Sequence, residues 1–296
     1  MKDTFSTYHP LLNMLYFVGV IGVTVFVVHP VILAISLFGG IAYSVLLKGW
    51  KKTVKFNLIF SIPMMLIVAL MNPMFNHYGV TIIGYLHNGN PFTLESCVYG
   101  LVMAMMLVCT MIWFSCYTIV MTSDKFIYLF GKVTPRLSLV LSMALRFIPL
   151  FRRQIGAISK TQKAMGLYST ESRTDRVLGG MRLFDSLLSW SIENSLDTAD
   201  AMKARGYGLP GRVNFSMFQF RKRDGVLLGV ILLLGIFIMA GFFCGQFDFY
   251  FYPVMDEIPK TVRAVCLYGC VLVFMTLPTL LEIKEKLQWN YLKSKI

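Results

Sequence analysis

The sequence of 296 residues is poor in charge and holds few groups that carry out chemistry. Only 15% of its residues are charged, it has four histidines, and none of its six cysteines stands in a CxxC pair. The close thiol spacing of zinc and redox sites is therefore missing, and we expect the cysteines to act as small packing residues. A GxxxxGK[ST] phosphate-binding loop is missing too. We expect no catalytic residue and no metal site in this chain.

Apolar residues, in contrast, make up 56% of the sequence, and the mean hydropathy is +0.64. An average soluble domain is only about 45–50% apolar. The excess is gathered into long runs, and crossing the hydrocarbon layer takes about 20 apolar residues per helix. The sequence therefore predicts an all-α, polytopic membrane protein with about six spans. These spans are predicted near 11–28, 31–47, 57–72, 97–121, 225–244 and 264–281.

The 28 Lys and Arg residues fall almost entirely on one side of the predicted spans. Segment 48–55 carries 4 of them, segment 122–224 carries 17, and loop 73–96 carries none. Because basic residues near the ends of spans favour the cytoplasm, we place both termini and both basic segments there. This puts 26 of the 28 in the cytoplasm. The net charge of +13 is thus explained by topology, and we expect no nucleic acid partner.

Three parts follow from this topology. Residues 1–121 hold about four spans, and residues 225–296 hold about two spans and a cytoplasmic tail. Residues 122–224 have apolar residues at helical spacing but too many charges to cross a bilayer, which predicts amphipathic cytoplasmic or interfacial helices. Within this part, Leu137–Leu150 is interrupted by Arg146 and Pro149. We expect a helix at the membrane interface there, bent at the proline.

Two further amphipathic helices are expected in the cytoplasmic part. The stripe of the first helix consists of Phe151, Ile155, Ile158 and Met165. The second helix is expected at about 184–205, with one face formed by Phe184, Leu188, Ile192, Leu196 and Ala199. The first helix is basic and the second is more acidic. These charges can be solvated, can pair with each other, or can meet a partner.

The two helices are expected to end in matching tripeptides, Ala164-Met165-Gly166 and Ala204-Arg205-Gly206. Glycine can take the left-handed conformation that closes a helix, and Pro210 prevents continuation after the second. Arg205 would then complement the dipole of the helix end, or offer its planar donors to a carboxylate on another protein. The sequence leaves both roles open.

Three stretches of this cytoplasmic part carry a resemblance to a known family. They are LRFIP (Leu145–Pro149), QKAMG (Gln162–Gly166) and AMKARGY (Ala201–Tyr207). Over roughly 122–210 the sequence resembles the transmembrane T component of energy-coupling factor (ECF) transporters, which take up vitamins and transition-metal ions in prokaryotes. The last stretch contains the Ala-Arg-Gly signature of that family. In the first tripeptide, at the end of the first helix, Met165 stands where the signature has arginine.

The resemblance implies a non-catalytic coupling subunit in a prokaryotic cell membrane. Its expected partners are two ABC ATPase subunits, a separate substrate-binding membrane subunit (S component) and the lipid bilayer. It implies that the two tips, at 164–166 and 204–206, contact the ATPases, and that Arg146 and Pro149 shape a coupling helix. ATP and Mg would be bound by the ATPases, with no cofactor in this chain. The substrate, the identity of the two ATPases, and whether the subunit is shared stay open.

Two other functions compete with this one. A conventional permease with its own substrate path would need polar groups inside the spans, for which Asn57, Asn72 and Thr110 are the candidates. An integral membrane transferase would use the basic segment to hold a phosphorylated substrate, but a paired-carboxylate motif with metal spacing is missing from that segment.

Overall fold

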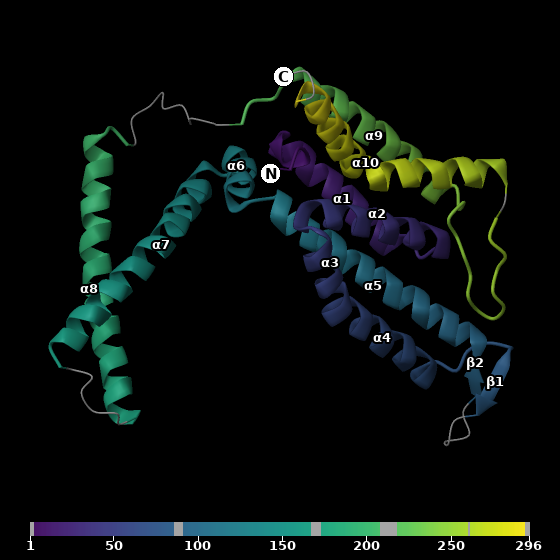
Figure 1. The fold of residues 1–296 in the computed structure, drawn as a ribbon, viewed down its shortest axis with the longest axis horizontal. Helices are drawn as coiled ribbons and strands as arrows, with labels where there is room; N and C mark the ends of the chain where they lie inside the picture. Colours follow the sequence, from purple (N-terminus) through teal and green to yellow (C-terminus); the bar gives the residue numbers. More distant parts are fainter. Residues whose placement is uncertain (1–2, 86–90, 167–172, 208–217, 260, 294–296) are drawn as a thin grey trace. The chain divides into compact units, whose positions relative to one another are not determined.

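The structure, a computed structural model, describes residues 3–85, 91–166, 173–207, 218–259 and 261–293 (Figure 1). Over these residues the regular structure is helical apart from one two-stranded sheet. The chain separates into two compact units. The spanning unit comprises Met1–Lys125 and Phe218–Ile296, and the two-helix unit comprises Phe126–Met217. The expected all-α polytopic fold is confirmed.

The spanning unit contains the predicted membrane helices. In the described part of the chain, five helical stretches are long and apolar enough to cross a bilayer. They are α2 (Pro30–Lys48), Trp50–Phe75, α5 (Leu94–Val120), α9 (Lys222–Phe243) and α10 (Val262–Lys293). Helix α1 (Pro10–Phe26) is equally apolar but has 17 residues, at the lower limit for a span.

The stretch Trp50–Phe75 is the least regular of these. It consists of α3 (Trp50–Phe56), a π-helical turn (Asn57–Ser61) and α4 (Ile62–Phe75). Proline begins the first two membrane helices, because it needs no hydrogen-bond partner at the first helical position. The connection before Pro30 is short, since only three residues separate α1 from α2.

The core of the spanning unit is formed by large side chains from α1, α2, α5 and α10. Trp113, Tyr16 and Tyr43 are fully buried. The Tyr16 hydroxyl donates to the carbonyls of Phe274 and Met275 at 3.1 and 3.3 Å, so it reaches across to α10. Such bonds are needed because hydrocarbon offers a polar group no partner.

The segment before α1 packs against the helices of the spanning unit through contacts that were not predicted from the sequence. Phe5 is fully buried, with the rings of Tyr16 and Tyr43 at 5.1 and 6.3 Å from its own. The Tyr43 hydroxyl donates to Asp3 Oδ2 at 2.9 Å, and the Thr4 N–H donates to a Glu282 carboxylate oxygen at 2.9 Å. Burial, together with the nearby Glu282 carboxylate, raises the pKa of Asp3 to about 6.

The connection between α4 and α5 contains a small sheet. Strands β1 (Ile82–Tyr85) and β2 (Pro91–Thr93) pair antiparallel. The Asn88-Gly89 pair between them in the sequence is a hairpin signal. That pair lies outside the described residues.

The two-helix unit is dominated by α7 (Pro135–Ala164) and α8 (Arg173–Ala204). Helix α6 (Ser123–Val133) precedes them and begins within the last residues of the spanning unit. Helix α7 runs through Pro149 without a break in its assignment. Helix α8 begins eleven residues before the start expected at 184, so that boundary was wrong.

Candidate functional site

Helix α7 ends in the conformation that its tripeptide predicts. Ala164 is its last residue, Met165 leaves the helix with φ −81° and ψ 5°, and Gly166 has φ +75°. The Gly166 N–H donates to the Lys163 carbonyl at 3.0 Å. Met165 is 63% exposed. A largely exposed apolar side chain therefore lies at the tip of α7.

Helix α8 ends in the same way, with a complete Schellman motif. Gly206 has φ +77°, its N–H donates to the Lys203 carbonyl at 2.9 Å, and the Tyr207 N–H donates to the Met202 carbonyl at 3.0 Å. These two bonds define the motif, and only glycine takes the left-handed conformation without cost. Both predicted helix ends are therefore present, with Arg205 in the position that Met165 occupies on α7.

Arg205 is exposed at its helix end. Across the described ranges no carboxylate lies within 4.0 Å of its guanidinium, whereas the neighbouring Lys203 is 3.6 Å from Asp200. A cation at the C-terminus of a helix is favoured by the helix dipole. The planar donors of Arg205 stay available to an acidic partner.

The two tips lie far apart on the two-helix unit. Phe151 of α7 meets Trp190 of α8, with ring centroids 5.9 Å apart. The two helices cross in Figure 1. Met165 lines a groove of about 480 Å³ together with Arg182 and Asp185 of α8. Arg205 is some twenty residues farther along α8, about 30 Å at 1.5 Å per residue. At this spacing the two tips do not form one joint site.

Arg146 and Pro149 are not part of either tip. They lie sixteen or more residues before Met165 on α7, about 24 Å or more along the helix. The guanidinium of Arg146 stands 5.8 Å from the ring of Phe147, which stacks on Phe151 near the crossing with α8. Their place is therefore in the body of α7.

A long apolar face of α8 is left uncovered within the two-helix unit. We call it the α8 stripe, and its residues are Val177, Met181, Phe184, Leu188, Ile192 and Leu196, each at least 45% exposed. The stripe runs about 28 Å along the helix. The side of α8 with Leu187 and Trp190 is more buried and includes the contact with Phe151. A continuous exposed apolar surface of this length marks an interaction site.

The sequence identified only part of this stripe. Phe184, Leu188, Ile192 and Leu196 were predicted as one face, but Val177 and Met181 precede the expected helix start. The same four-and-three spacing extends back to both residues. The helix was not predicted to begin this early because the preceding segment is rich in charge and glycine. These residues are Arg173, Asp175, Arg176, Gly179 and Gly180.

The fold and these surfaces define an integral membrane protein of helical spans that carries a separate unit of two long amphipathic helices. The family model described as "CbiQ: Cobalt transport protein" matches residues 5–217, more than half of the chain. The chain therefore belongs to the CbiQ family of cobalt transport proteins, and the resemblance to the ECF transporter T component is confirmed.

Curated relatives carry the name "Energy-coupling factor transporter transmembrane protein EcfT". The protein of Bacillus selenitireducens is 34% identical over 114 residues, covering 38% of this chain and 42% of the relative. That of Listeria innocua is 38% identical over 94 residues, covering 31% and 36%. That of Lactococcus lactis is 30% identical over 105 residues, covering 35% and 40%. The matches span about two fifths of the length of these relatives.

Proposed function

We propose that this chain is the membrane-embedded coupling subunit of an ECF-type importer, which passes ATP-driven motion of two ATPase subunits to a substrate-binding membrane subunit. The observation that carries the proposal is the pair of glycine-closed helix tips on one two-helix unit. Membership in the CbiQ family and similarity to EcfT proteins support it. The chain itself then needs no catalytic group.

Each tip would bind one ATPase subunit. The guanidinium of Arg205 suits an acidic groove, because it is exposed and lacks a carboxylate neighbour in the described part of the chain. Met165 suits an apolar groove, since its flexible thioether side chain fills irregular pockets. The unlike chemistry of the tips favours two different ATPase subunits, which would hold ATP and Mg.

The α8 stripe would bind the substrate-binding subunit. Its exposed apolar residues lie along the helix whose end carries Arg205. A movement of the ATPase at that end would therefore reach the stripe through one continuous helix. Rigid-body displacement of packed helices is a common way to transmit such a change.

The membrane orientation belongs to the same proposal. With both termini and segments 48–55 and 122–224 in the cytoplasm of a prokaryotic cell, 26 of the 28 basic residues lie inside. The tips of α7 and α8 are then on the side where ATP is available. Vitamins and transition-metal ions are the substrate classes that the family resemblance suggests.

Purification of the tagged chain from native membranes tests this function against the permease alternative. We expect ATPase subunits and one small membrane protein to copurify, and ATP-dependent uptake in vesicles only when all are present. Uptake by the purified chain alone would favour a conventional permease. A magnesium-dependent group transfer by the chain alone would favour a transferase.

A further inference from the structure

A second kind of site lies in the spanning unit, where α9 ends and α10 begins. There α9 and the start of α10 enclose a groove of about 380 Å³. Its residues are Phe237, Ala240, Gly241, Cys244, Gln246, Val262, Arg263, Cys266 and Leu267. A Cβ on Gly241 would meet Leu267 at 2.8 Å, so the two helices touch at the floor of the groove.

Arg263 is the single charged side chain among these lining residues. It is exposed, and no carboxylate of the described residues lies within 4.0 Å of it. The loop before it contains Asp248, Asp256 and Glu257, and Asp256 accepts a bond from the Tyr250 N–H at 3.0 Å instead. Arg263 therefore forms no ion pair with a described carboxylate at the rim of the groove.

The groove changes character with depth in the membrane. Arg263 and Cys244 stand at the start of α10 and the end of α9, and a helix that spans the hydrocarbon layer has its ends near the headgroups. Phe237 lies seven residues inward from Cys244, about 10 Å along α9. The groove thus has a cation at headgroup level and apolar side chains deeper in the membrane. A soluble anion would contact only the cation, and a neutral lipid would contact only the apolar side chains.

The geometry points to a binding site for an anionic glycerophospholipid, with its phosphodiester against Arg263 and an acyl chain between α9 and α10. One basic residue near an anionic headgroup contributes about 1 kcal/mol, or about a fivefold preference over a zwitterionic lipid. This site is independent of the coupling function proposed above.

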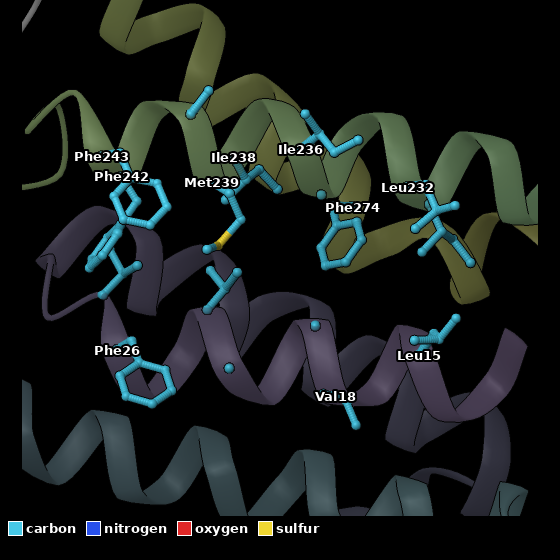
Figure 2. Close-up of a pocket in the computed structure, with 17 residues that line it drawn as sticks. Leu15, Val18, Phe26, Leu232, Ile236, Ile238, Met239, Phe242, Phe243 and Phe274 are labelled. Carbon is cyan, nitrogen blue, oxygen red and sulfur yellow. The ribbon is translucent and has the colours of Figure 1, made fainter. Parts of the chain in front are cut away.

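A neighbouring groove provides an internal control. An apolar groove of about 770 Å³ lies between α1 and α9 (Figure 2). Ala240 lines both this groove and the α9–α10 groove. Leu15, Val18 and Phe26 line it from α1, and Leu232, Ile236 and Phe243 from α9. No charged residue belongs to its lining. This groove offers hydrocarbon contact without a preference for headgroup charge.

Quenching of an introduced tryptophan by brominated lipids tests the site. Phe237→Trp places the reporter in the α9–α10 groove, and Val18→Trp places it in the control groove. Both side chains are about half exposed, which leaves room for the larger ring. The full chain is reconstituted in phosphatidylcholine vesicles with a minor fraction of brominated phosphatidylglycerol or brominated phosphatidylcholine. Emission of the unmodified protein is subtracted to remove Trp50, Trp113, Trp190 and Trp289.

We expect about a fivefold preference for phosphatidylglycerol at position 237, its loss when Arg263→Gln is added, and no preference at position 18. The basic residues at the other end of α9 do not reach the reporter, because Arg223 is about 21 Å away along the helix. Equal quenching by both lipids at 237, or a preference that survives Arg263→Gln, would overturn the site. Native mass spectrometry is independent of the reporter. The wild type should retain one more phosphatidylglycerol than Arg263→Gln, and equal retention would also overturn it.

Discussion

Replacing Phe184 and Ile192 together by serine removes two side chains from the middle of the α8 stripe. They are 64% and 55% exposed, so the change leaves few contacts broken inside the chain. Full burial of one such side chain contributes about 1.5–3 kcal/mol, and roughly half of that, ~1–1.5 kcal/mol, is still available to a partner. The pair should therefore weaken binding of the substrate-binding subunit by about 2–3 kcal/mol, or about 30- to 150-fold.

The assay is the affinity of the purified chain for its substrate-binding subunit in lipid nanodiscs, with thermal unfolding measured in parallel. Glu193→Ser is the matched control, because Glu193 is exposed beside Ile192 but lies off the stripe. We expect wild-type affinity for the control and an unchanged unfolding midpoint for both proteins. Wild-type affinity in the double variant would refute the assignment of the stripe as a binding face.

Three further predictions concern the tip of α8 and the segment before α1. Gly206→Ala forces alanine into a left-handed conformation at a cost of about 1–2 kcal/mol. Hydrogen exchange at the Tyr207 amide should therefore accelerate, and unchanged exchange would argue against the observed helix cap. Phe5→Ala should destabilise the spanning unit by about 3–5 kcal/mol in thermal unfolding. An unchanged unfolding midpoint would show that packing of the segment before α1 does not stabilise the unit. The folded state raises the pKa of Asp3 to about 6 and so binds more protons than the unfolded chain. Stability should therefore fall as pH rises from about 4 through 6, and Asp3→Asn should flatten that slope in unfolding measured across this range.

The membrane helices could be predicted because their signal is local. An apolar run marks a span, as the close agreement of 225–244 with Lys222–Phe243 illustrates. The same run does not mark the end of the helix. Helix α10 continues to Lys293, well beyond the predicted limit at 281, because a charged helix remains stable once it leaves the membrane.

The candidate site was predictable to a similar degree. The closing glycines at 166 and 206 act through their own backbone, so the tripeptides identified both helix ends. Tertiary contacts leave no such trace. Asp3 meets Tyr43 across 40 positions, and Thr4 meets Glu282 across 278, so no sequence pattern reports these contacts.

The exposure of the α8 stripe was equally hidden. Helical spacing identifies an apolar face but does not say whether α7 covers it. The crossing through Phe151 and Trp190 turns another side of α8 toward α7 and leaves Leu188 and Leu196 exposed. The exposure of the stripe therefore follows only from the packing of the two helices.

In the proposed function, the α8 tip docks on an ATPase subunit through Arg205. The most direct measurement is the affinity of the ATPase for Arg205→Glu, compared with Lys203→Glu. Lys203 is a second exposed cation, two residues earlier, that already pairs with Asp200. Losing one partner of an interfacial charge pair costs about 2–5 kcal/mol. We predict that Arg205→Glu lowers the affinity at least about 30-fold while Lys203→Glu stays near wild type. Equal affinities for the two variants would contradict the docking role of Arg205.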